Sequence, residues 1–192
     1  MAIEEFPRMK RLPPYVFATV NALKMEARRR GEDIIDLGMG NPDLPAPRHV
    51  IEKMMETVGK SRTDRYSASK GLPGLRRAQA AYYDRRFGVK LNPETQVVAT
   101  LGSKEGFANM AQAITAPGDV VLCPSPGYPV YANYTHLCGG EPYTMPLTAA
   151  NGFIPDLKAI PEDVAKKAKI MFLNYPNNPT GATATRAFLN EV

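Results

Sequence analysis

Apolar residues recur at helical spacing in several stretches of the chain. Val16, Val20, Leu23 and Ala27 follow one another at intervals of four, three and four residues, which places them on one face of a helix. Prolines precede this stretch and a glycine follows it, so we expect an amphipathic helix over residues 12–30. The same spacing predicts helices over 49–58, from residue 73 onward, over 107–114 and 128–137, and from about residue 183 onward.

Short, mainly apolar runs predict strands at four other places. They cover residues 34–37, 97–101, 120–123 and 170–173, and each leads into a turn rich in glycine, proline or asparagine. Such runs between helices are typical of a mostly parallel sheet covered on both faces, so the predicted class is α/β. Three or four strands are few for such a sheet, and the last helix reaches Val192 without a cap. We therefore expect the fold to be incomplete in this chain.

Composition and charge exclude several classes of protein. The 192 residues are 44% hydrophobic and 22% charged, as in ordinary globular proteins, so a disordered or collagen-like chain is excluded. The formal net charge of +5 is modest, and the cations between residues 8 and 30 alternate with Glu and Asp. This alternation is typical of a solvated helix face, and we expect no nucleic-acid partner.

The cysteine, histidine and hydropathy patterns predict a cytoplasmic protein without a bound metal. Cys123 and Cys138 are the only cysteines and belong to no CxxC or Cys/His ligand pattern, so we expect reduced thiols. His136 together with Cys138 is too small a set for a metal site. The first residues contain no apolar signal core, and no stretch approaches the ~18 apolar residues of a membrane span. We therefore expect no membrane partner.

A segment between two glycines, Gly102–Gly106, follows the run 97–101 and opens the next predicted helix. Ligands of open α/β sheets bind outside the carboxyl ends of the strands, where helix N-termini face the crevice. Backbone N–H groups, the Ser103 hydroxyl and the Lys104 ammonium are suited to binding one phosphate group there. Alternatively, Ser103 is a plain N-cap, with Lys104 and Glu105 exposed in the first turn. The segment is neither a P-loop nor a GxGxxG nucleotide motif.

Two more loops follow predicted strand ends. Tyr128 lies between prolines in Pro126–Pro129, where its ring is suited to stacking on a flat ligand; alternatively, the ring packs on the core. Asn178 lies in Asn177–Gly181, where its amide is suited to donating to a ligand oxygen; alternatively, this segment forms an Asx-type turn. Taken singly, these residues leave both interpretations open.

Four segments, taken together and in order, resemble one family closely: the class I and II aminotransferases of the fold-type-I pyridoxal phosphate (PLP) enzymes. The segments are Asp36–Asp43, Arg65–Arg76, Gly102–Gly106 and Asn174–Gly181. The resemblance extends from about Leu12 to the last residue. Residues 12–41 are most similar to the branch that contains alanine and LL-diaminopimelate aminotransferases.

The resemblance implies a three-layer PLP-dependent transferase fold. Residues 1–45 would form an N-terminal arm helix and the first strand, as part of the small domain, and residues 46–192 the N-terminal part of the large PLP-binding domain. PLP is the implied cofactor, an amino acid and a 2-oxo acid are the implied substrates, and amino acid biosynthesis is the implied role. A homodimer is also implied, because Tyr66 matches the tyrosine that crosses the dimer interface to the phosphate bound by the partner subunit.

The resemblance assigns roles to five further residues. Ser103 and Lys104 would hold the PLP phosphate, and Tyr128 would stack on the pyridine ring. Asn178 would hydrogen-bond the phenolic oxygen of the cofactor and take part in substrate binding. Gly40 would bring its backbone close to the substrate carboxylate, which a residue without a side chain permits.

Three catalytic groups of the family have no match in this chain. They are the lysine that forms the Schiff base, the acidic partner of the pyridinium nitrogen, and the arginine that binds the substrate carboxylate. In the family they follow the segment matched by Asn178–Gly181, whereas Lys70 and Lys104 belong to other motifs. We therefore expect the whole protein to be an enzyme and this chain alone to be inactive.

Three other functions remain open at this stage. A different PLP reaction, such as C–S β-elimination, would use the same phosphate and ring contacts. A transcription regulator with an aminotransferase-like domain would need a helix-turn-helix module before that domain, and few residues precede Asp36. The third is a noncatalytic remnant that folds only with a complementary chain. The amino donor and acceptor are not determined by the sequence.

Overall fold

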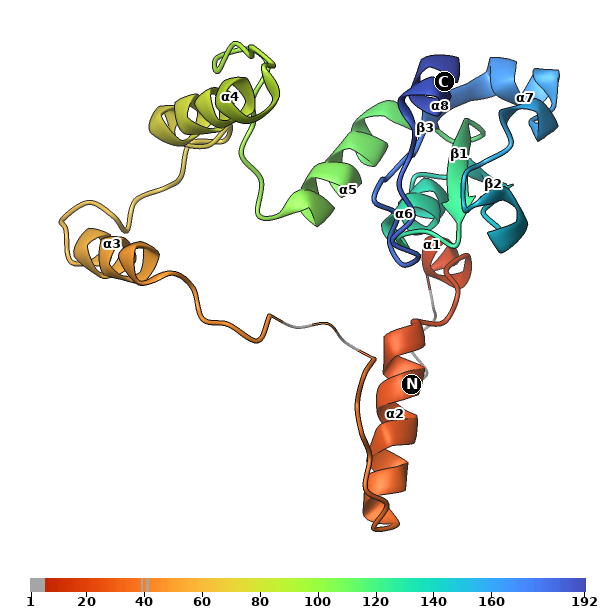
Figure 1. The fold of residues 1–192 in the computed structure, drawn as a ribbon, viewed down its shortest axis with the longest axis horizontal. Coiled ribbons are helices and arrows are strands. Elements are labelled where there is room, and N and C mark those ends of the chain that lie inside the picture. Colours follow the sequence, from red (N-terminus) through yellow and green to blue (C-terminus); the bar gives the residue numbers. More distant parts are fainter. Residues whose placement is uncertain (1–5, 39, 41) are drawn as a thin grey trace. The chain divides into compact units, whose positions relative to one another are not determined.

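A computed structural model describes residues 6–38, 40 and 42–192. The chain divides into two compact units, one of residues 1–14 with 100–192 and one of residues 15–99. All strands of the described ranges belong to the first unit, and the second unit contains three helices (Figure 1). The predicted division at residue 45 into parts of a small and a large domain stays a prediction.

The first unit is built on a three-stranded sheet. Its strands are β1 (Val120–Ser125), β2 (Glu141–Pro146) and β3 (Ala168–Met171). Its helices are α1 (Pro7–Lys10), α5 (Ser103–Ile114), α6 (Val130–Leu137), α7 (Glu162–Lys167) and α8 (Arg186–Glu191), with 3-10 turns at Ala149–Asn151 and Leu157–Ala159. Of the elements between α5 and β3, the apolar patterns predict α5, β1, α6 and β3 and miss β2 and α7.

The three strands run parallel in the order β2-β1-β3. Val120 of β1 pairs with Glu141 of β2 on one side and with Ala168 of β3 on the other. The backbone N–H of Phe172 donates to the carbonyl of Leu122 at 3.0 Å, so the pairing continues one residue past β3. A parallel sheet with helices in its connections confirms the predicted α/β class.

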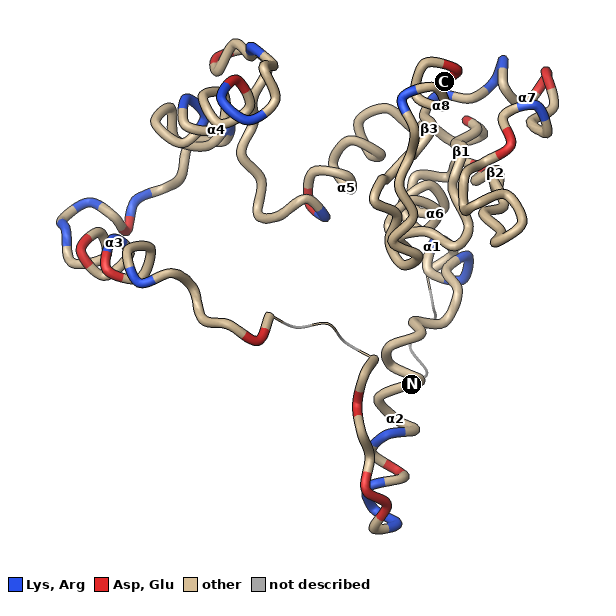
Figure 2. The backbone as a smooth tube through the Cα atoms, in the orientation of Figure 1, with Lys and Arg blue, Asp and Glu red and all other residues tan. Residues whose placement is uncertain are grey.

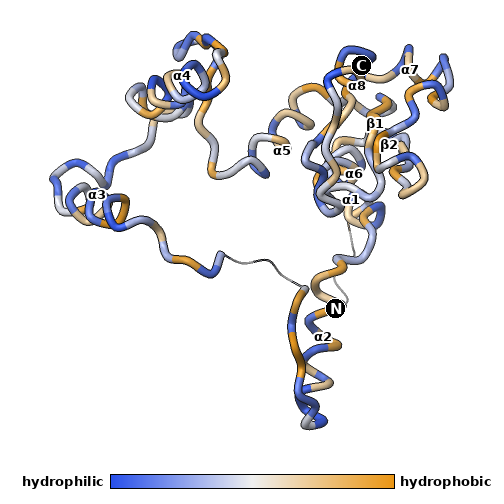
Figure 3. Tube along the Cα trace, in the orientation of Figure 1, coloured by the Kyte–Doolittle hydropathy of each residue, from blue (hydrophilic) through white to orange (hydrophobic). Residues whose placement is uncertain are grey.

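The core of the first unit lies around β1, along which Figure 3 shows a hydrophobic run. Val121 and Cys123 of β1 pack with Tyr131 of α6 and with Phe172. The rings of Tyr131 and Phe172 stack with their centroids 4.5 Å apart, and the ring of Phe107 in α5 meets that of Phe172 edge-on at 6.3 Å. Each such pair adds about 0.5–1.5 kcal/mol to the stability gained by burial. These contacts hold α5 and α6 against the sheet.

The second unit contains α2 (Val16–Arg29), α3 (Arg48–Val58) and α4 (Pro73–Phe87), all of which the apolar spacing predicts. Proline occupies the first position of α4, where its missing N–H costs no hydrogen bond. The helix ends at Gly88, whose φ of 68° is the left-handed conformation that favours glycine. The local sequence thus accounts for both ends of α4.

Basic and acidic residues are interspersed along the second half of α2 and the segment that follows it (Figure 2). Arg30 pairs with Glu26 at 3.2 Å and with Glu32 at 2.7 Å, and Lys24 pairs with Asp36 at 2.8 Å. The hydrogen bond from Lys24 lowers the pKa of the Asp36 carboxyl below its ordinary value. Exposed pairs of this kind contribute little to stability. The arrangement agrees with the predicted solvated helix face.

Two of the predicted strands are wrong. Residues 34–37 and 97–101 form no ladder with any strand in the described ranges, and the side chain of Leu101 is 93% exposed. The N–H of Ala99 donates instead to the carbonyl of Lys70 at 3.0 Å. An apolar run indicates a segment that is suited to a sheet, but a strand also requires a neighbour for its N–H and C=O groups. No described segment supplies that neighbour.

The apolar patterns missed β2, whose sequence Glu-Pro-Tyr-Thr-Met-Pro contains two prolines. Proline lacks a ladder donor and is confined to edge strands, and β2 lies at the edge of the sheet. The helices predicted over 128–137 and from 183 begin at Val130 and Arg186. Within the described ranges, no helix is long and apolar enough to cross a membrane.

Candidate functional site

The carboxyl ends of β1 and β3 lie at one edge of the sheet, because the two strands are parallel neighbours. β1 leads into the turn that carries Tyr128, and β3 leads into the loop that carries Asn178. Ligands of parallel α/β sheets bind at this edge. The sheet therefore brings two of the predicted loops to the same side of the first unit.

The N-cap of α5 is Gly102, which has φ of 83° and ψ of 162°. Ser103 is the first helical residue, so the alternative in which Ser103 is the N-cap is wrong. No side chain of the described residues caps this helix, and its first N–H groups have no partner within the helix. A Cβ added to Gly102 would meet no atom within 4 Å, so an anion has room to approach these N–H groups.

Glu105 supports the loop before α5, a contact that the sequence analysis missed. Its carboxylate accepts the backbone N–H of Leu101, and Thr100 Oγ1 donates to the carbonyl of Gly102 at 3.0 Å. A capping box needs a Ser, Thr, Asp or Asn N-cap, whereas the N-cap here is Gly102 and Glu105 bonds the residue before it, so the local sequence carried no signal for this role. Because the carboxylate of Glu105 is engaged with the loop, it does not cap the N–H groups of Ser103 and Lys104.

Lys104 and Tyr128, which are distant in sequence, lie next to each other. The Lys104 ammonium is 5.8 Å from the centroid of the Tyr128 ring, within the range of a cation–π contact. The Tyr128 ring is partly buried and meets Tyr131 of the core edge-on at 6.0 Å. Core packing thus accounts for one edge of the ring, and the contact with Lys104 links the ring to the N-terminus of α5.

The two asparagines after β3 have different surroundings. Asn177 is 4% exposed, its Nδ2 donates to Thr180 Oγ1 at 2.9 Å, and its backbone N–H donates to the carbonyl of Ala182 at 2.8 Å. The turn over residues 177–181, which was the alternative interpretation of this segment, is therefore stabilised by Asn177. Asn178 is exposed, and within the described part of the chain its side chain makes no hydrogen bond. Its amide is available to a ligand.

Tyr66 and Gly40 belong to the second unit. Tyr66 lies in a loop after α3, its side chain is fully exposed, and residues 64–67 line a hollow on the surface. Gly40 is exposed as well. Its neighbours Met39 and Asn41, which belong to the same predicted motif, lie outside the described residues. The roles of Tyr66 and Gly40 stay predictions.

The donor set at the N-terminus of α5 fits the phosphate of PLP, the cofactor that the resemblance implies. Unpaired backbone N–H groups, the Ser103 hydroxyl and the Lys104 ammonium supply hydrogen-bond donors and positive charge to a phosphate. Tyr128 adds an aromatic surface for a planar ring. A hydrogen bond to a charged group contributes about 1.5–3 kcal/mol, so several together bind a phosphate tightly.

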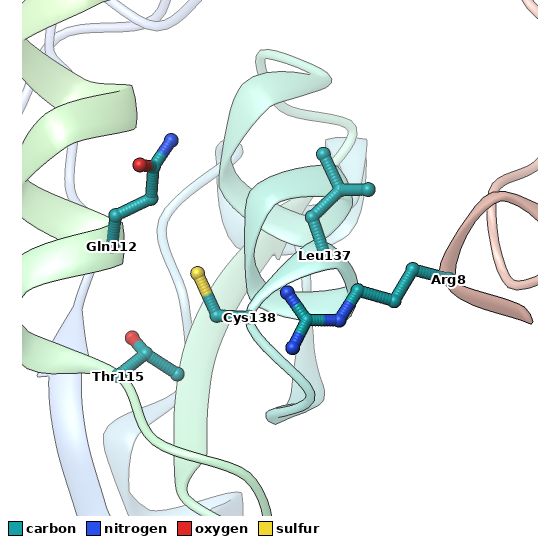
Figure 4. A pocket seen from close by; sticks show the side chains of 5 residues that line it. All are labelled: Arg8, Gln112, Thr115, Leu137 and Cys138. Carbon is teal, nitrogen blue, oxygen red and sulfur yellow. The ribbon is translucent and has the colours of Figure 1, made fainter. Parts of the chain in front are cut away.

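A separate cavity lies between α1, α5 and α6 (Figure 4). It is lined by Arg8, Gln112, Thr115, Leu137 and Cys138. Burial raises the pKa of the Cys138 thiol, and the charge of Arg8 opposes this shift. A cation beside a thiol is unfavourable for a metal ion, and the described residues contain no group of three His, Cys, Asp or Glu side chains able to hold one. The cavity is not part of the candidate site.

Comparison with known proteins gives consistent matches. The family model for aminotransferase class I and II matches residues 32–192. AatC of Rhizobium meliloti (strain 1021), named as an aminotransferase, is 60% identical over 190 residues, 99% of this chain and 47% of the relative. The LL-diaminopimelate aminotransferase of Moorella thermoacetica is 53% identical, over 99% of this chain and 49% of the relative. The apo structure of BacF from Bacillus subtilis superposes with a TM-score of 0.89 at 42% identity, covering 98% of this chain and 49% of that chain.

The chain spans about half the length of the curated relatives that it matches. The family sequence therefore continues beyond the matched part in those relatives, in agreement with the expectation that this fold is incomplete here. The aminotransferases among these relatives and structural neighbours are PLP enzymes. The predicted cofactor thus agrees with the donor set found at α5.

Proposed function

We propose that the whole protein is a PLP-dependent aminotransferase, because the chain belongs to the class I and II aminotransferase family. It would transfer an amino group between an amino acid and a 2-oxo acid. The observation that carries the proposal is the meeting of Lys104, the Tyr128 ring and the uncapped N-terminus of α5. Family membership supports the reaction class, and this donor set supports the place of the cofactor.

In this proposal the residues of the first unit bind and orient the cofactor. Ser103, Lys104 and the first N–H groups of α5 bind the phosphate, and Tyr128 packs on the ring. Asn178 donates to the phenolic oxygen and, together with the backbone of Gly40, helps to orient the substrate. PLP, when bound, supplies the ring that withdraws electrons from the reacting carbon of the substrate.

The lysine that holds the cofactor covalently is assigned to the part of the protein outside residues 1–192. Lys104 has its ammonium 5.8 Å from the centroid of the Tyr128 ring, and this proposal gives it the phosphate as its ligand. Lys70 belongs to a turn in the second unit, where its carbonyl accepts a hydrogen bond from Ala99. Neither lysine is assigned the proton transfer that an aminotransferase requires.

The site also requires a second subunit in this proposal. Family members are typically homodimers. The Tyr66 side chain is fully exposed, so its hydroxyl is available to a phosphate bound by a partner subunit. A two-fold dimer would give each subunit the Tyr66 of the other.

The proposal is tested by following a labelled amino group in the purified whole protein. The donors include LL-diaminopimelate, because several curated relatives are named LL-diaminopimelate aminotransferases. Alanine and aspartate are included because similar solved structures are named alanine and aspartate aminotransferases. We expect transfer of ¹⁵N from a donor to a 2-oxo acid, loss of transfer in the Ser103→Ala/Lys104→Ala variant, and normal transfer in Lys158→Ala, a control at an exposed lysine. Release of ammonia and a thiol from a cysteine-like substrate without transfer would indicate the C–S lyase instead. A PLP-loaded protein that carries out neither reaction would indicate a noncatalytic remnant.

A further inference from the structure

Arg76 is a buried charge for which the proposed reaction has no role so far. It lies in the first turns of α4 and is 5% exposed, and it is the only buried charged side chain in the described part of the chain. A guanidinium is costly to bury unless its donors are satisfied. Its partners therefore show what this charge stabilises.

The Arg76 guanidinium connects α4 to two other segments of the second unit. Nε donates to the carbonyl of Gly71 at 3.3 Å, Nη2 donates to the carboxylate of Glu94 at 3.0 Å, and Nη1 donates to the carbonyl of Pro93. Two of these acceptors are backbone carbonyls, so the bonds fix the path of the chain. The rigid, planar fork of arginine reaches three such acceptors at once, which the point charge of a lysine does not.

The segment that contains Pro93 and Glu94 is itself a well-defined turn. The N–H of Glu94 donates to Asn92 Oδ1 at 2.8 Å, and the N–H of Asn92 donates to Gln96 Oε1 at 2.8 Å. The backbone also closes between Gln96 N–H and the Asn92 carbonyl at 2.9 Å. Arg76 is therefore attached to a rigid support on this side.

The segment on the other side carries Tyr66. The N–H of Gly71 donates to the carbonyl of Ala68 at 2.8 Å and closes a turn two residues after Tyr66. A Cβ at Gly71 would lie 2.3 Å from the Cβ of Ala99, so the two chain segments touch closely. The Gly71 turn is thus held by Arg76 and packed against Ala99.

We propose that Arg76 is a positioning residue for Tyr66, an inference that rests on the proposed function. The Tyr66 side chain is fully exposed, so the place of its hydroxyl depends on how its backbone is anchored. On the C-terminal side of Tyr66 the first hydrogen-bonded turn is Ala68–Gly71. Arg76 links the last residue of this turn to Pro93 and Glu94. Arg76 thus acts on the phosphate-binding tyrosine without touching the cofactor.

A double-mutant cycle in the whole protein tests this inference, with the Kd of PLP as readout. Arg76→Lys keeps the charge but loses the fork, and Tyr66→Phe removes the hydroxyl. We expect each change to raise the Kd roughly tenfold, as for the loss of one charge-assisted hydrogen bond, and the double variant to bind no more weakly than the weaker single variant. Arg77→Lys, at the exposed neighbour on α4, is the matched control and leaves the Kd unchanged.

Thermal unfolding separates positioning from stability. In the Tyr66→Phe background, Arg76→Lys is expected to lower the Tm as it does alone, but not to raise the Kd further. Glu94→Gln is the second variant if Arg76→Lys prevents folding, because it leaves both carbonyl contacts of the guanidinium in place. We expect a smaller rise in the Kd, which again disappears with Tyr66→Phe.

The outcomes distinguish failure of the inference from failure of the proposed function. The inference is overturned if Arg76→Lys or Glu94→Gln, combined with Tyr66→Phe, raises the Kd of PLP by the product of the two single effects. Arg76 would then have only a structural role. In that case the wild-type protein still binds PLP and transfers amino groups. If the wild-type protein and Arg77→Lys bind no PLP at all, the proposed function is overturned together with the inference.

Discussion

The contact between the Lys104 ammonium and the Tyr128 ring is the most informative contact of the candidate site. A cation over an aromatic ring at an exposed position contributes about 0.5–1 kcal/mol. A hydrogen bond to a charged group contributes about 1.5–3 kcal/mol. We therefore infer that Lys104 turns from the ring to the phosphate when the cofactor binds, which leaves the face of Tyr128 to the pyridine ring.

Tyr128→Ala tests the stacking role of this ring. Loss of an aromatic surface worth about 0.5–1.5 kcal/mol raises the Kd of PLP roughly 2- to 12-fold. Tyr128→Phe keeps the stacking surface and the edge-on contact with Tyr131, so its Kd stays near that of the wild type. Absorbance titration measures both values. An unchanged Kd in Tyr128→Ala would show that the ring serves only the core.

The sequence was sufficient to propose candidate site residues, but it did not indicate how their surroundings differ. The position of Ser103 and Lys104 after an apolar run and before a helix indicates a phosphate site locally. The surroundings of Asn177 and Asn178 differ, because Asn177 is buried and hydrogen-bonded to Thr180 and Ala182, whereas Asn178 is exposed. Burial of that kind depends on how the loop folds back and has no signature in the local pattern.

Among the helices and strands, the prediction was correct where the apolar residues of a segment repeat at helical spacing within that segment. The apolar positions of α2 repeat at helical spacing, and the proline and glycine of α4 mark its ends. The strand predicted over 97–101 failed because its hydrogen-bond partners must come from elsewhere in the fold. The opposite error occurred at β2, which has two prolines and forms only because β1 lies beside it.

Gly102→Ala tests the geometry of the α5 N-terminus. A Cβ there meets nothing within 4 Å, but φ of 83° with ψ of 162° is a conformation that essentially only glycine adopts, at a cost of about 1–3 kcal/mol for an L-residue. We expect a lower Tm and a severalfold higher Kd for PLP. Gly74→Ala in α4 has the same open surroundings without a positive φ, and alanine is favoured in helices. It should leave both values unchanged or raise the Tm, and equal losses in the two variants would contradict this account.

For the whole molecule, the shared site can be tested by co-expressing two variants that each weaken the PLP site, at a PLP concentration at which neither variant alone is saturated. Tyr66→Phe and Lys104→Ala each impair every site of their own homodimers. If Tyr66 serves the partner subunit, a hybrid dimer contains one intact site, and random pairing restores about one quarter of the wild-type activity. Activity no higher than the sum of the two separate variants would show that Tyr66 serves its own subunit.

The 192-residue chain alone is expected to carry no specific covalent PLP and no transamination activity. Its cofactor would be held only by noncovalent contacts, without the lysine that the reaction requires. Borohydride reduction with PLP, followed by peptide mass mapping, measures this. A single stoichiometric pyridoxyl group at Lys70 or Lys104, together with amino transfer, would contradict the expectation.

The order of four motifs was sufficient to predict the family of the molecule, because each motif places donors or glycines at a fixed chain position. The amino donor could not be predicted. The family's carboxylate-binding arginine has no match here, and the curated relatives are about twice as long as this chain. Substrate choice in such enzymes depends on groups that meet only in the complete fold.

The most direct test of this account compares PLP with pyridoxal, its phosphate-free form, as ligands of the whole protein. The difference in affinity isolates the phosphate contribution, because both ligands carry the same ring and aldehyde. We predict that the wild type and Lys158→Ala bind PLP at least about 100-fold more tightly than pyridoxal, since each charge-assisted hydrogen bond contributes about 1.5–3 kcal/mol. The Ser103→Ala/Lys104→Ala variant should lose most of this preference. A double variant that kept the full preference for PLP would contradict the assignment of the phosphate to the N-terminus of α5.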